Sequence, residues 1–433
     1  MEGRVLLIGD GDLSVETERA LDAAGAEVSR LAEPDEDEVR AALEDEEIAS
    51  VAIVARADAV VLRMALMVRA VREDVPLLLT IFDATMAETM ERELPNTRVT
   101  SLADIVAPSL AGPCIDERFT AVSTEDGRPV GLVESEGEVH EEDIPKYRQR
   151  RPEALARALF TPYDKSAGLL LFGAIGLVAV FLVETITAVF VLDDSVVDAI
   201  YGSAKTLVTV DPNLKVSDGP GWYKLFTSAT MLVALVFAAA FTAGLVNRVI
   251  ERRLTGLFGR RAVPRRDHVV VIGLGQVGLR LCALLRACNV PVVAVERDAD
   301  SENVGLARES GLPVVIGRGA DPSLARRLSL QRARAVAAVT SDDLENISAA
   351  MTARGIHRDV RVVLRVGDGH VANETRSLLT IGLVRDVHRI AAGLLASMAL
   401  GEGADSVVCL GDDAHLRFPD GRLERAELDA LAG

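Results

Sequence analysis

The sequence predicts a multidomain membrane protein in which two α/β domains flank a module of two transmembrane helices. Three observations predict this fold class. Two apolar runs are each long enough to cross a bilayer, a glycine-rich turn lies on either side of them, and strand and helix patterns alternate after each turn. The composition agrees, because 49% of the 433 residues are hydrophobic while 26% are charged.

The composition also argues against several functions. A net charge of −18 and only 4% aromatic residues disfavour a nucleic-acid partner, because phosphate binding requires a basic surface and base binding favours aromatic stacking. No CxxC motif occurs, so we expect the four cysteines to be buried, reduced thiols that form neither disulfides nor a metal site. The stretches outside the predicted domains are too short for the substrate domain of a dehydrogenase, and the six histidines form no constellation with them. We therefore predict no enzymatic activity and no catalytic residues.

The predicted spans are residues 167–192, with Glu184 as the single charge, and residues 225–246, with no charge. Each exceeds the ~20 residues needed to cross the hydrocarbon core. The alternative is a pair of buried helices in a soluble core, but such helices are rarely apolar all round over this length. Basic residues gather before the first span and after the second, and the segment between them is acidic. The positive-inside rule then predicts a multi-pass protein of the inner or plasma membrane with both termini in the cytoplasm.

The clearest binding motif follows the second span. A short apolar run, residues 268–272, ends in Gly273-Leu-Gly275-Gln-Val-Gly278, and a helical pattern then leads to a second apolar run that ends in Glu296. In such a turn the first glycine makes the bend, the second lets a pyrophosphate approach, and the third lets helix and strand pack closely. Glu296 is placed where a carboxylate can bond a ribose hydroxyl. The pattern predicts a nucleotide-binding Rossmann domain; the alternative is a Rossmann unit that keeps the turn for packing and binds nothing.

Strand patterns recur after this motif, as expected of a parallel sheet. They are residues 313–316, 335–339 and 360–365. The N-terminal part repeats the arrangement, because a strand pattern leads into Gly9-Asp-Gly11-Asp-Leu-Ser14 and later strand patterns follow. Residues 50–55 correspond to 335–339, and residues 75–80 to 360–365. We infer an internal duplication at the level of a domain.

The first copy departs from the fingerprint. Ser14 replaces the third glycine, and Asp10 and Asp12 put negative charge where a pyrophosphate would lie. We therefore expect the first copy to be a structural or weakly binding partner of the second.

These patterns divide the chain into six parts. The parts are an N-terminal Rossmann-like domain (1–117), a hairpin and linker (118–164), the transmembrane module (165–250), a basic linker (251–266), the nucleotide-binding Rossmann domain (267–400) and a C-terminal tail (401–433). In the second part, residues 119–124 and 129–133 suggest the hairpin, and the acidic and basic stretches after it suggest a linker. The tail suggests a strand pair and a short helix.

Together the motifs resemble the two-transmembrane potassium channels and transporters that are regulated by RCK (TrkA-N) domains. The resemblance covers both Rossmann units, the spans and the loop between them, although two such units flanking the spans is less usual than one following them. It is most specific in the glycine turn with Glu296, in Asp321 and in the stretch from Thr340 to Asn346. The cofactor-binding residues that it implies are Gly273, Gly275, Gln276, Val277, Gly278, Glu296, Arg297, Asp321 and Thr340.

The resemblance implies a nucleotide ligand, and the residues leave its identity open. Glu296 suits the ribose diol that NAD, NADH, ATP, ADP and AMP all carry. The same carboxylate disfavours NADP, whose 2′-phosphate would face it.

The loop between the spans, residues 194–214, resembles the pore region of these channels in part. Residues 194–205 can form a short helix, which we expect to place Val196, Val197, Ile200, Tyr201 and Ala204 on its apolar positions. The next residues match the approach to a potassium filter, but Asp and Asn replace the two filter glycines and Pro212 replaces the tyrosine. The filter-like residues are Thr206, Thr209, Val210, Asp211 and Asn213.

This replacement has a physical consequence. A stack of filter carbonyls needs backbone conformations that glycine adopts freely, and Pro212 biases Asp211 toward extended ones. We expect that the potassium-selective stack does not form as in the family. The alternatives are a monovalent-cation pathway built from Thr206, Thr209 and a ring of Asp211 carboxylates, or an exposed turn after the helix.

Two further residues in the spans have two interpretations each. Glu184 is an ionisable residue at membrane depth, which suggests either a functional group or a protonated carboxyl bonded to a neighbouring helix. Gly244 is either a hinge or a close-packing site.

The overall prediction is a nucleotide-regulated, potassium-like cation channel or transport protein gated by its cytoplasmic domains. Two spans cannot enclose a pore alone, so the channel would be a homo-oligomer in the lipid bilayer, expected to be a tetramer. The alternative is a membrane-tethered nucleotide sensor or accessory subunit of an ion transporter, which conducts nothing itself.

Overall fold

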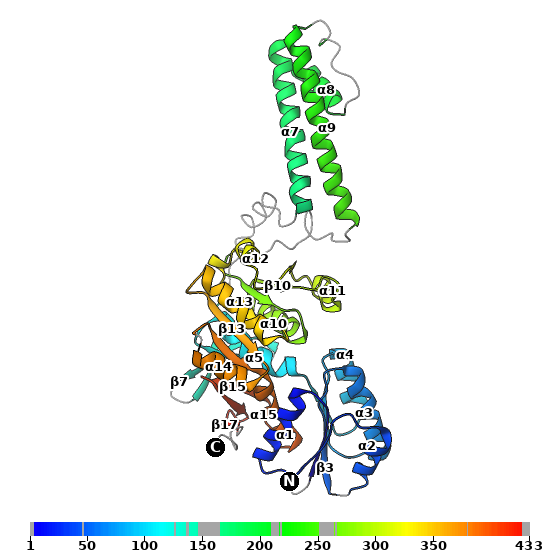
Figure 1. The fold of residues 1–433 in the computed structure, drawn as a ribbon, viewed down its shortest axis with the longest axis vertical. Coiled ribbons are helices and arrows are strands. Elements are labelled where there is room, and N and C mark those ends of the chain that lie inside the picture. The colour runs from blue at the N-terminus through cyan, green and yellow to red at the C-terminus, as the bar shows by residue number, and fades with distance from the viewer. Residues whose placement is uncertain are drawn as a thin grey trace. The chain divides into compact units, whose positions relative to one another are not determined.

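The structure is a computed structural model of the chain (Figure 1). It describes residues 4–45, 47–124, 127–135, 138–145, 165–208, 216, 219–250, 264, 266–378 and 380–426. The chain forms two compact units, of which one consists of residues 1–148 and 263–433 and the other of residues 149–262.

The N-terminal part of the first unit is a parallel sheet with the strand order β2-β1-β3-β4-β5. Its strands are β1 (Arg4–Ile8), β2 (Val28–Leu31), β3 (Ile48–Ile53), β4 (Leu77–Thr80) and β5 (Thr97–Thr100), and the helices between them are α1 (Asp12–Ala23), α2 (Glu36–Leu43), α3 (Asp58–Val71) and α4 (Ala84–Glu93). Val5 and Leu7 face the core that contains α1, whereas Leu6 and Ile8 face the core that contains α2 and α3. Helices therefore cover both faces, which is why β1 is apolar at successive positions.

The C-terminal part of the same unit contains a parallel sheet with the order β11-β10-β9-β12-β13-β14. Its strands are β9 (Val269–Ile272), β10 (Val292–Glu296), β11 (Val314–Ile316), β12 (Ala335–Ala338), β13 (Arg361–Val366) and β14 (Leu383–Asp386). The helices are α10 (Gln276–Ala287), α11 (Glu302–Glu309), α12 (Pro322–Arg327), the 3-10 helix η3 (Leu330–Arg332), α13 (Asp343–Ile356) and α14 (Gly369–Leu378). The predicted α/β fold is confirmed in both parts.

The pairing register of the two sheets confirms the internal duplication. Val5 pairs with Ser50 in the first sheet, and Val269 pairs with Ala335 at the same place in the second. In the next strands, β4 and β13, the same register makes Leu79 of the first copy equivalent to Leu364 of the second. The two correspondences predicted from the sequence are therefore those of the fold.

The two copies differ on one side of the first strand. In the second copy, α11, the edge strand β11, α12 and η3 lie between β10 and β12. In the first copy, α2 alone connects β2 to β3. The second sheet therefore has a strand beyond β10, whereas β2 is itself the edge of the first sheet.

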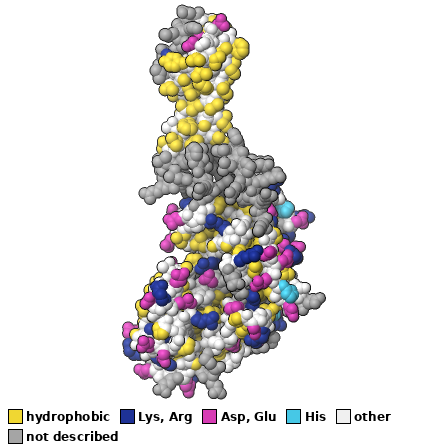
Figure 2. All heavy atoms as spheres, turned by 180° about the vertical axis from the view of Figure 1, so that it is seen from behind, with side chains coloured by type: hydrophobic (Ala, Val, Ile, Leu, Met, Phe, Trp, Pro, Cys, Tyr) yellow, Lys and Arg dark blue, Asp and Glu magenta, His cyan; other side chains and the backbone are white. Residues whose placement is uncertain are grey.

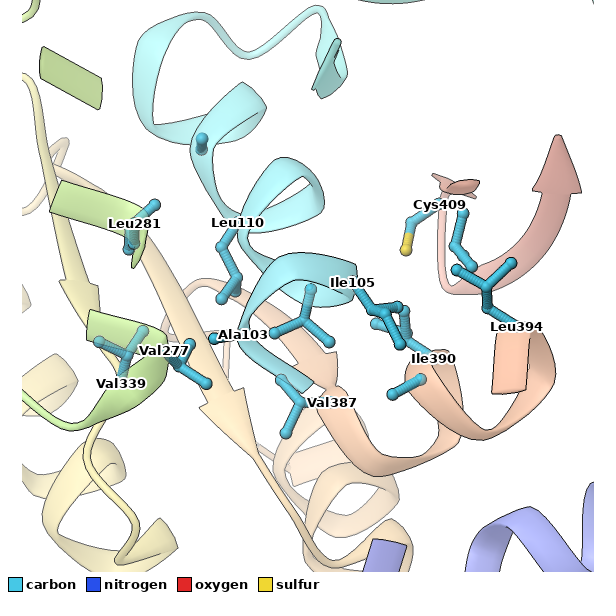
Figure 3. Close-up of a cluster of buried hydrophobic side chains, with 14 of the residues drawn as sticks. Ala103, Ile105, Leu110, Val277, Leu281, Val339, Val387, Ile390, Leu394 and Cys409 are labelled. Atoms are coloured by element: carbon cyan, nitrogen blue, oxygen red, sulfur yellow. The ribbon is translucent and has the colours of Figure 1, made fainter. Parts of the chain in front are cut away.

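A helix follows the last strand of each sheet and packs against the other copy. Helix α5 (Leu102–Ile115) follows β5 and packs on α10, and α15 (Val387–Ala399) follows β14 and packs on α1. Figure 3 shows Leu110 of α5 near Val277 and Leu281 of α10, with α15 on the other side of α5. The buried side chains of α1, α5, α10 and α15 belong to a single hydrophobic core, so each copy completes the core of the other.

A small antiparallel sheet follows each of these two helices. The sheet after α5 consists of β6 (Phe119–Ser123), β7 (Val130–Ser135) and β8 (Glu138–Asp143), and the sheet after α15 consists of β15 (Ser406–Leu410), β16 (Asp413–Arg417) and β17 (Leu423–Arg425). Leu132 of the first sheet packs with Val408 of the second. The duplication thus extends through both small sheets.

These sheets correct two predictions. The predicted hairpin in residues 118–164 is present, but the acidic segment assigned to a linker forms its third strand, because Val139 packs against the small core while its acidic neighbours remain outside. The tail contains three strands where a pair was predicted. The short helix predicted near its end falls outside the described residues, as does nearly all of the basic linker 251–266.

The second unit contains two long helices and a short one between them. They are α7 (Lys165–Val191), α8 (Val196–Leu207) and α9 (Gly221–Ile250). By length and composition, α7 and α9 can cross a membrane over Gly168–Val191 and Gly221–Val246. Figure 2 shows hydrophobic side chains over much of the visible surface of this unit. Helix α9 begins four residues before the predicted span 225–246, because Lys224 interrupts the apolar run without interrupting the helix.

Glycines set the distance between α7 and α9. A Cβ added to Gly173 would lie 2.6 Å from the amide nitrogen of Phe241, and one added to Gly244 would lie 2.7 Å from that of Leu170. A Cβ on Gly176 would overlap the Phe237 ring. Helix α9 runs through Gly244 without a break, so the structure supports the close-packing interpretation of this glycine over the hinge.

The shared core predicts a large cost for truncating α5. Leu110 is fully buried between the two copies, so Leu110→Ala should lower the free energy of unfolding of the first unit by about 2–5 kcal/mol. Leu66→Ala is the matched control, because Leu66 is 52% exposed on α3. Urea unfolding followed by circular dichroism would measure both variants. Equal changes in the two would contradict the shared core.

Candidate functional site

The candidate site lies at the carboxyl end of the second sheet. The strand order reverses between β9 and β12, since β10 and β11 extend from one side of β9 and β12 to β14 from the other. In open parallel sheets a crevice forms at such a point, beyond the carboxyl ends of the strands. The glycine turn after β9 opens into this position.

Each glycine of the turn has a separate structural reason. Gly273 has φ +99°, and a Cβ there would lie 2.8 Å from the amide nitrogen of Thr340. A Cβ on Gly278 would overlap the carbonyl oxygen of Gly273, so helix and turn are in direct contact. Gly275 is the N-cap of α10, and a Cβ there would meet no atom within 4 Å. The second glycine therefore leaves open space at the N-terminus of a 12-residue helix, where an anion is attracted.

Two predicted residues next to this glycine differ in the groups that a ligand could contact. Val277 is buried in the shared core, so only its backbone amide is available to a ligand. Gln276 is the first residue of α10 and is half-buried. Both contribute amides to the helix N-terminus, which needs partners for its first donors.

Glu296 ends β10 beside the turn. Its Oε2 accepts a hydrogen bond of 2.7 Å from the Leu274 amide, and its Oε1 accepts from the amides of Arg297 and Asp298 at 2.8 and 3.1 Å. The sequence suggested a bond to a ribose hydroxyl, and it did not indicate that this carboxylate also ties the glycine turn to β10. Three backbone amides thus hold the carboxylate in place.

Thr340 ends the strand pattern on the other side of the crevice. The side-chain amide of Asn346 accepts from the Thr340 amide at 2.9 Å and from its hydroxyl at 2.8 Å, and donates to the carbonyls of Thr340 and Arg365, each at 3.0 Å. Asn346 is fully buried. It therefore links the ends of β12 and β13 and shapes the second wall of the crevice.

The side chains of Arg297 and Asp321 already bind other residues of the protein. The Arg297 guanidinium pairs with Glu345 of α13 at 3.5 Å, which joins the β10 side of the crevice to the β12 side. Asp321 is exposed and caps α12 by accepting from the Ser323 amide at 2.8 Å, and hydrogen bonds from Ser323 lower its pKa. Asp321 follows β11, which is two strands away from the glycine turn.

A half-buried arginine at this edge was missed in the sequence. Arg365 lies near the end of β13, and its Nε–H is buried and has no hydrogen-bond partner within the described residues. Burial lowers the pKa of Arg365, Asp343 raises it, and Arg56 of the first copy lowers it. The end of β3 in one copy therefore brings a second cation near the crevice of the other. No local pattern indicates this proximity, because it depends on how the copies pack.

The equivalent turn in the first copy is built differently. The Ser14 hydroxyl, in place of the third glycine, donates to the Gly9 carbonyl at 3.0 Å. Because Ile8 pairs with Leu31 as Ile272 pairs with Val295, the position equivalent to Glu296 is Ala32. The acid after the first copy's second strand is thus one residue out of place, and the edge strand beyond it is missing. These differences support the prediction that the first copy is a weak or structural partner.

The filter-like residues fall only partly within the described chain. Thr206 is buried on α8, and its hydroxyl donates to the Gly202 carbonyl at 3.2 Å. Thr209, Val210, Asp211 and Asn213 lie outside the described residues.

The short helix predicted in residues 194–205 is present as α8, but the opposite face is buried. The buried residues are Ala199, Gly202, Ser203 and Thr206, and the exposed ones include Val196, Val197, Ile200 and Tyr201. Small residues allow α8 to approach the long helices, and Thr185 of α7 donates to the Ser203 hydroxyl at 3.0 Å. The predicted apolar face is left for contacts outside this unit.

Glu184 of α7 is buried, and its carboxylate accepts a hydrogen bond from the Thr230 hydroxyl of α9. This is the bond to a neighbouring helix that the second interpretation of Glu184 required. The Thr230 hydroxyl oxygen also lies 2.9 Å from the Thr227 carbonyl oxygen. Glu184 therefore joins the two long helices through a side-chain hydrogen bond.

Comparison with known proteins identifies the same region. Residues 269–381 match the model of the TrkA-N domain. The TrkA potassium uptake protein of Streptomyces coelicolor is 32% identical over 161 residues, which are 37% of this chain and 67% of that protein. Potassium channel protein 1 of Methanocaldococcus jannaschii is 22% identical over 205 residues, which are 45% of this chain and 59% of that protein. The voltage-gated potassium channel Kch of Escherichia coli is 25% identical over 191 residues, 42% of this chain and 45% of Kch.

The chain thus spans about half the length of these two potassium channels. Among solved structures, the GsuK RCK domain aligns with a TM-score of 0.51 and 13% identity over 93% of this chain and 77% of that one. The GsuK channel bound to NAD aligns with a TM-score of 0.52 and 14% identity over 93% of this chain and 64% of that one. At these identities the alignments show a similarity of fold.

The two equivalent glycines allow a test that separates binding from folding. Gly275→Ala adds a methyl group where the apo protein has space, so the melting temperature without ligand should not change. The methyl group occupies the approach to the helix N-terminus, and the affinity for ADP or NAD should fall at least about tenfold. Isothermal titration calorimetry would measure the affinities.

Gly11→Ala is the matched control, because a Cβ on Gly11 also meets no atom within 4 Å. It should leave the affinity unchanged. An equal loss in both variants, or no loss in Gly275→Ala, would contradict a ligand site confined to the second copy.

Proposed function

Because the chain belongs to the TrkA-N family, we propose that it is a nucleotide-regulated potassium transport protein of the cell membrane. The carrying observation is the open N-terminus of α10 at Gly275, beside the fixed carboxylate of Glu296, in a chain that also has two membrane-length helices. Ligand binding and membrane crossing thus occur in one polypeptide. The relatives named as potassium channels and potassium uptake proteins support potassium as the cation.

The ligand is proposed to be NAD(H) or an adenine nucleotide. The open helix N-terminus suits the phosphates, and Glu296 suits a ribose diol. The unpartnered Nε–H of Arg365 adds a cationic donor at the far side of the crevice, near Arg56. A buried donor of this kind without a partner is costly, and a phosphate group of the ligand would supply one.

Regulation is proposed to act through the short connection after the second membrane helix. Residues 251–268 separate the end of α9 from the start of β9, the strand that leads into the glycine turn. The ion pair between Arg297 and Glu345 connects the β10 side of the crevice to the β12 side. A ligand that binds between the two sides can therefore change their relative positions. Coupling requires that the ligand bind one arrangement of the cytoplasmic unit more tightly than another.

Conduction requires several chains, since two helices cannot enclose a pore. We propose a homo-oligomer, with a tetramer as the expected number and both termini in the cytoplasm. The exposed apolar face of α8 and the apolar surface of α7 and α9 are available to lipid or to neighbouring chains.

The second candidate is an accessory subunit that senses nucleotide and conducts nothing. It is favoured by one observation, the sequence Asp211-Pro212-Asn213 in place of the filter glycines and tyrosine. A carbonyl stack of the potassium-selective kind is hard to form with these residues.

Flux measurements distinguish the two candidates. The full chain in potassium-loaded liposomes should release potassium at a rate that changes severalfold when NAD, NADH, ADP or ATP is added on the cytoplasmic side. Gly275→Ala should retain flux and lose this response, and Gly11→Ala should retain both. Flux that ignores every nucleotide would contradict regulation, and no flux under any condition would leave the accessory subunit as the function.

The role of Arg365 is tested by separating phosphate from nucleoside. Arg365→Gln removes the charge and keeps hydrogen-bonding groups, so the affinity for ADP should fall about tenfold or more, while the weak binding of adenosine should change little. The comparison is made by calorimetry at one salt concentration, because phosphate binding depends on screening. A parallel loss for both ligands would show that Arg365 supports the fold of the crevice and does not bind phosphate.

A further inference from the structure

The helix that each copy sends to the other carries a charged residue at the same place. In α5 this residue is Asp104, whose amide bonds the capping Ser101 at 3.0 Å. The Asp104 Oδ1 lies 2.6 Å from Nε of Arg280 in α10, and Oδ2 lies 3.3 Å from the Arg280 Nη2. An ion pair with one hydrogen bond, from Nη2 to Oδ2, therefore joins the start of α5 to the second copy.

The equivalent positions in the other half of the interface carry the opposite charges. The alignment of Gly9 with Gly273 makes Glu16 of α1 the equivalent of Arg280. In α15 the capping residue is Asp386, whose carboxylate accepts from the Arg389 amide at 3.1 Å, so Arg389 is the equivalent of Asp104. Burial raises the pKa of the Asp386 carboxyl, and the nearby Glu16, which also pairs with Arg19 of α1, raises it further. Acid and base have thus exchanged places between the two halves.

The other end of α5 shows the same preference for the second copy. Nη1 of Arg361 donates to the Pro113 carbonyl at 3.1 Å, and Nη1 of Arg334 donates to the Ile115 carbonyl at 2.9 Å. These carbonyls are at the negative end of the helix, where cations are favourable. By register, the equivalent residues in the first copy are Pro76 and Ala49, which have no side-chain donor.

We propose that these charges direct the pairing of the two copies, so that each first copy pairs with a second copy and like copies do not pair between chains. In the native arrangement both ends of α5 meet arginines. If α5 packed on the first copy of another chain, Asp104 would face Glu16, and its carboxyl end would face Pro76 and Ala49.

The reverse mismatch applies to the second copy. If α15 packed on α10 of another chain, Arg389 would face Arg280. Specificity of this kind comes from the penalty on the wrong partner as much as from the attraction of the right one. Because the chains of a homo-oligomer are held together in one membrane, pairing of like copies would otherwise be a close competitor.

In this proposal the first copy of each chain pairs with the second copy of the same chain. The proposal rests on the packing of the cytoplasmic unit alone. It stands whether or not the protein conducts ions or binds nucleotide, and none of the residues that it uses belongs to the glycine turn or the crevice.

Native thiols provide the measurement. Cys114 of α5 and Cys282 of α10 are buried on the two sides of the interface, and burial, followed by the nearby Cys114, raises the pKa of Cys282. By register, Glu18 is the first-copy equivalent of Cys282. In the full-length chain carrying Glu18→Cys, oxidation with copper phenanthroline in air can join Cys114 directly to Cys282 in the native pairing, or to the thiol introduced at position 18 in pairing of like copies.

The decisive variant exchanges two charges without changing the net charge. In Glu18→Cys protein prepared from mixed heavy- and light-isotope chains, the parent should give Cys114–Cys282 links within one chain. Glu16→Arg with Arg280→Glu should reduce that link at least about fivefold and produce links from Cys114 to position 18 between chains. Adding Asp104→Arg and Arg389→Asp to this variant should restore the parent pattern. If the two-charge variant keeps the parent pattern, the proposal is wrong.

If the two-charge variant does not fold, the rates of thiol labelling in single-charge variants test the same proposal. In the native-cysteine chain, Asp104→Arg should speed maleimide labelling of Cys114 and Cys282 about three- to tenfold, as expected for losing a partly exposed ion pair and gaining a like-charge contact. Asp104→Arg with Arg280→Glu should return labelling to the parent rate. Asp37→Arg, which makes the same change in the exposed first turn of α2, is the control. Equal rates in Asp104→Arg and Asp37→Arg, or no recovery in the double variant, overturn the proposal.

Discussion

The exchange of α5 and α15 between the two copies is the interaction on which the α/β unit depends. Each of these helices is buried almost all round, so neither can remain on its own copy and be exposed to water. Each lies instead on the first helix of the other copy, and the side chains of both copies merge into one core. Burying this apolar surface is the dominant favourable term, and it requires both copies.

This dependence explains how two copies of one fold can differ so much in their turns. The first copy is needed for the core that it shares with the second. For that role the residues from Gly9 to Ser14 have only to form a turn that packs, and they need not bind a ligand. Ser14 bonds the Gly9 carbonyl, and Ala32 replaces the carboxylate that holds the turn in the second copy. The second copy keeps an open helix N-terminus and a carboxylate bonded to the turn, which are features of a binding site. The first copy completes the shared core, and the second copy is proposed to bind the nucleotide.

The helical unit is built on a different principle. Its outer surface is hydrophobic, so burial of apolar area does not drive its helices together in a bilayer, and close packing and polar contacts act instead. Gly173, Gly176 and Gly244 let α7 and α9 approach, and the bond between Glu184 and Thr230 joins them inside the apolar region. A carboxyl group at that depth is costly unless it has a partner, which Thr230 supplies.

The sequence by itself determined the α/β class of both copies, their duplication and the two long helices, because each depends on local periodicity or on a motif of adjacent residues. It also located the glycine turn and Glu296. It missed α5, whose apolar residues surround the helix and leave no periodic stripe, and it did not indicate that the face of small residues on α8 is the buried one. Tertiary structure alone decided that α5 and α15 exchange places, that Arg56 approaches Arg365 and that Asp104 meets Arg280. These contacts join residues distant in the chain, and their energies depend on which surfaces face one another, which no local pattern records.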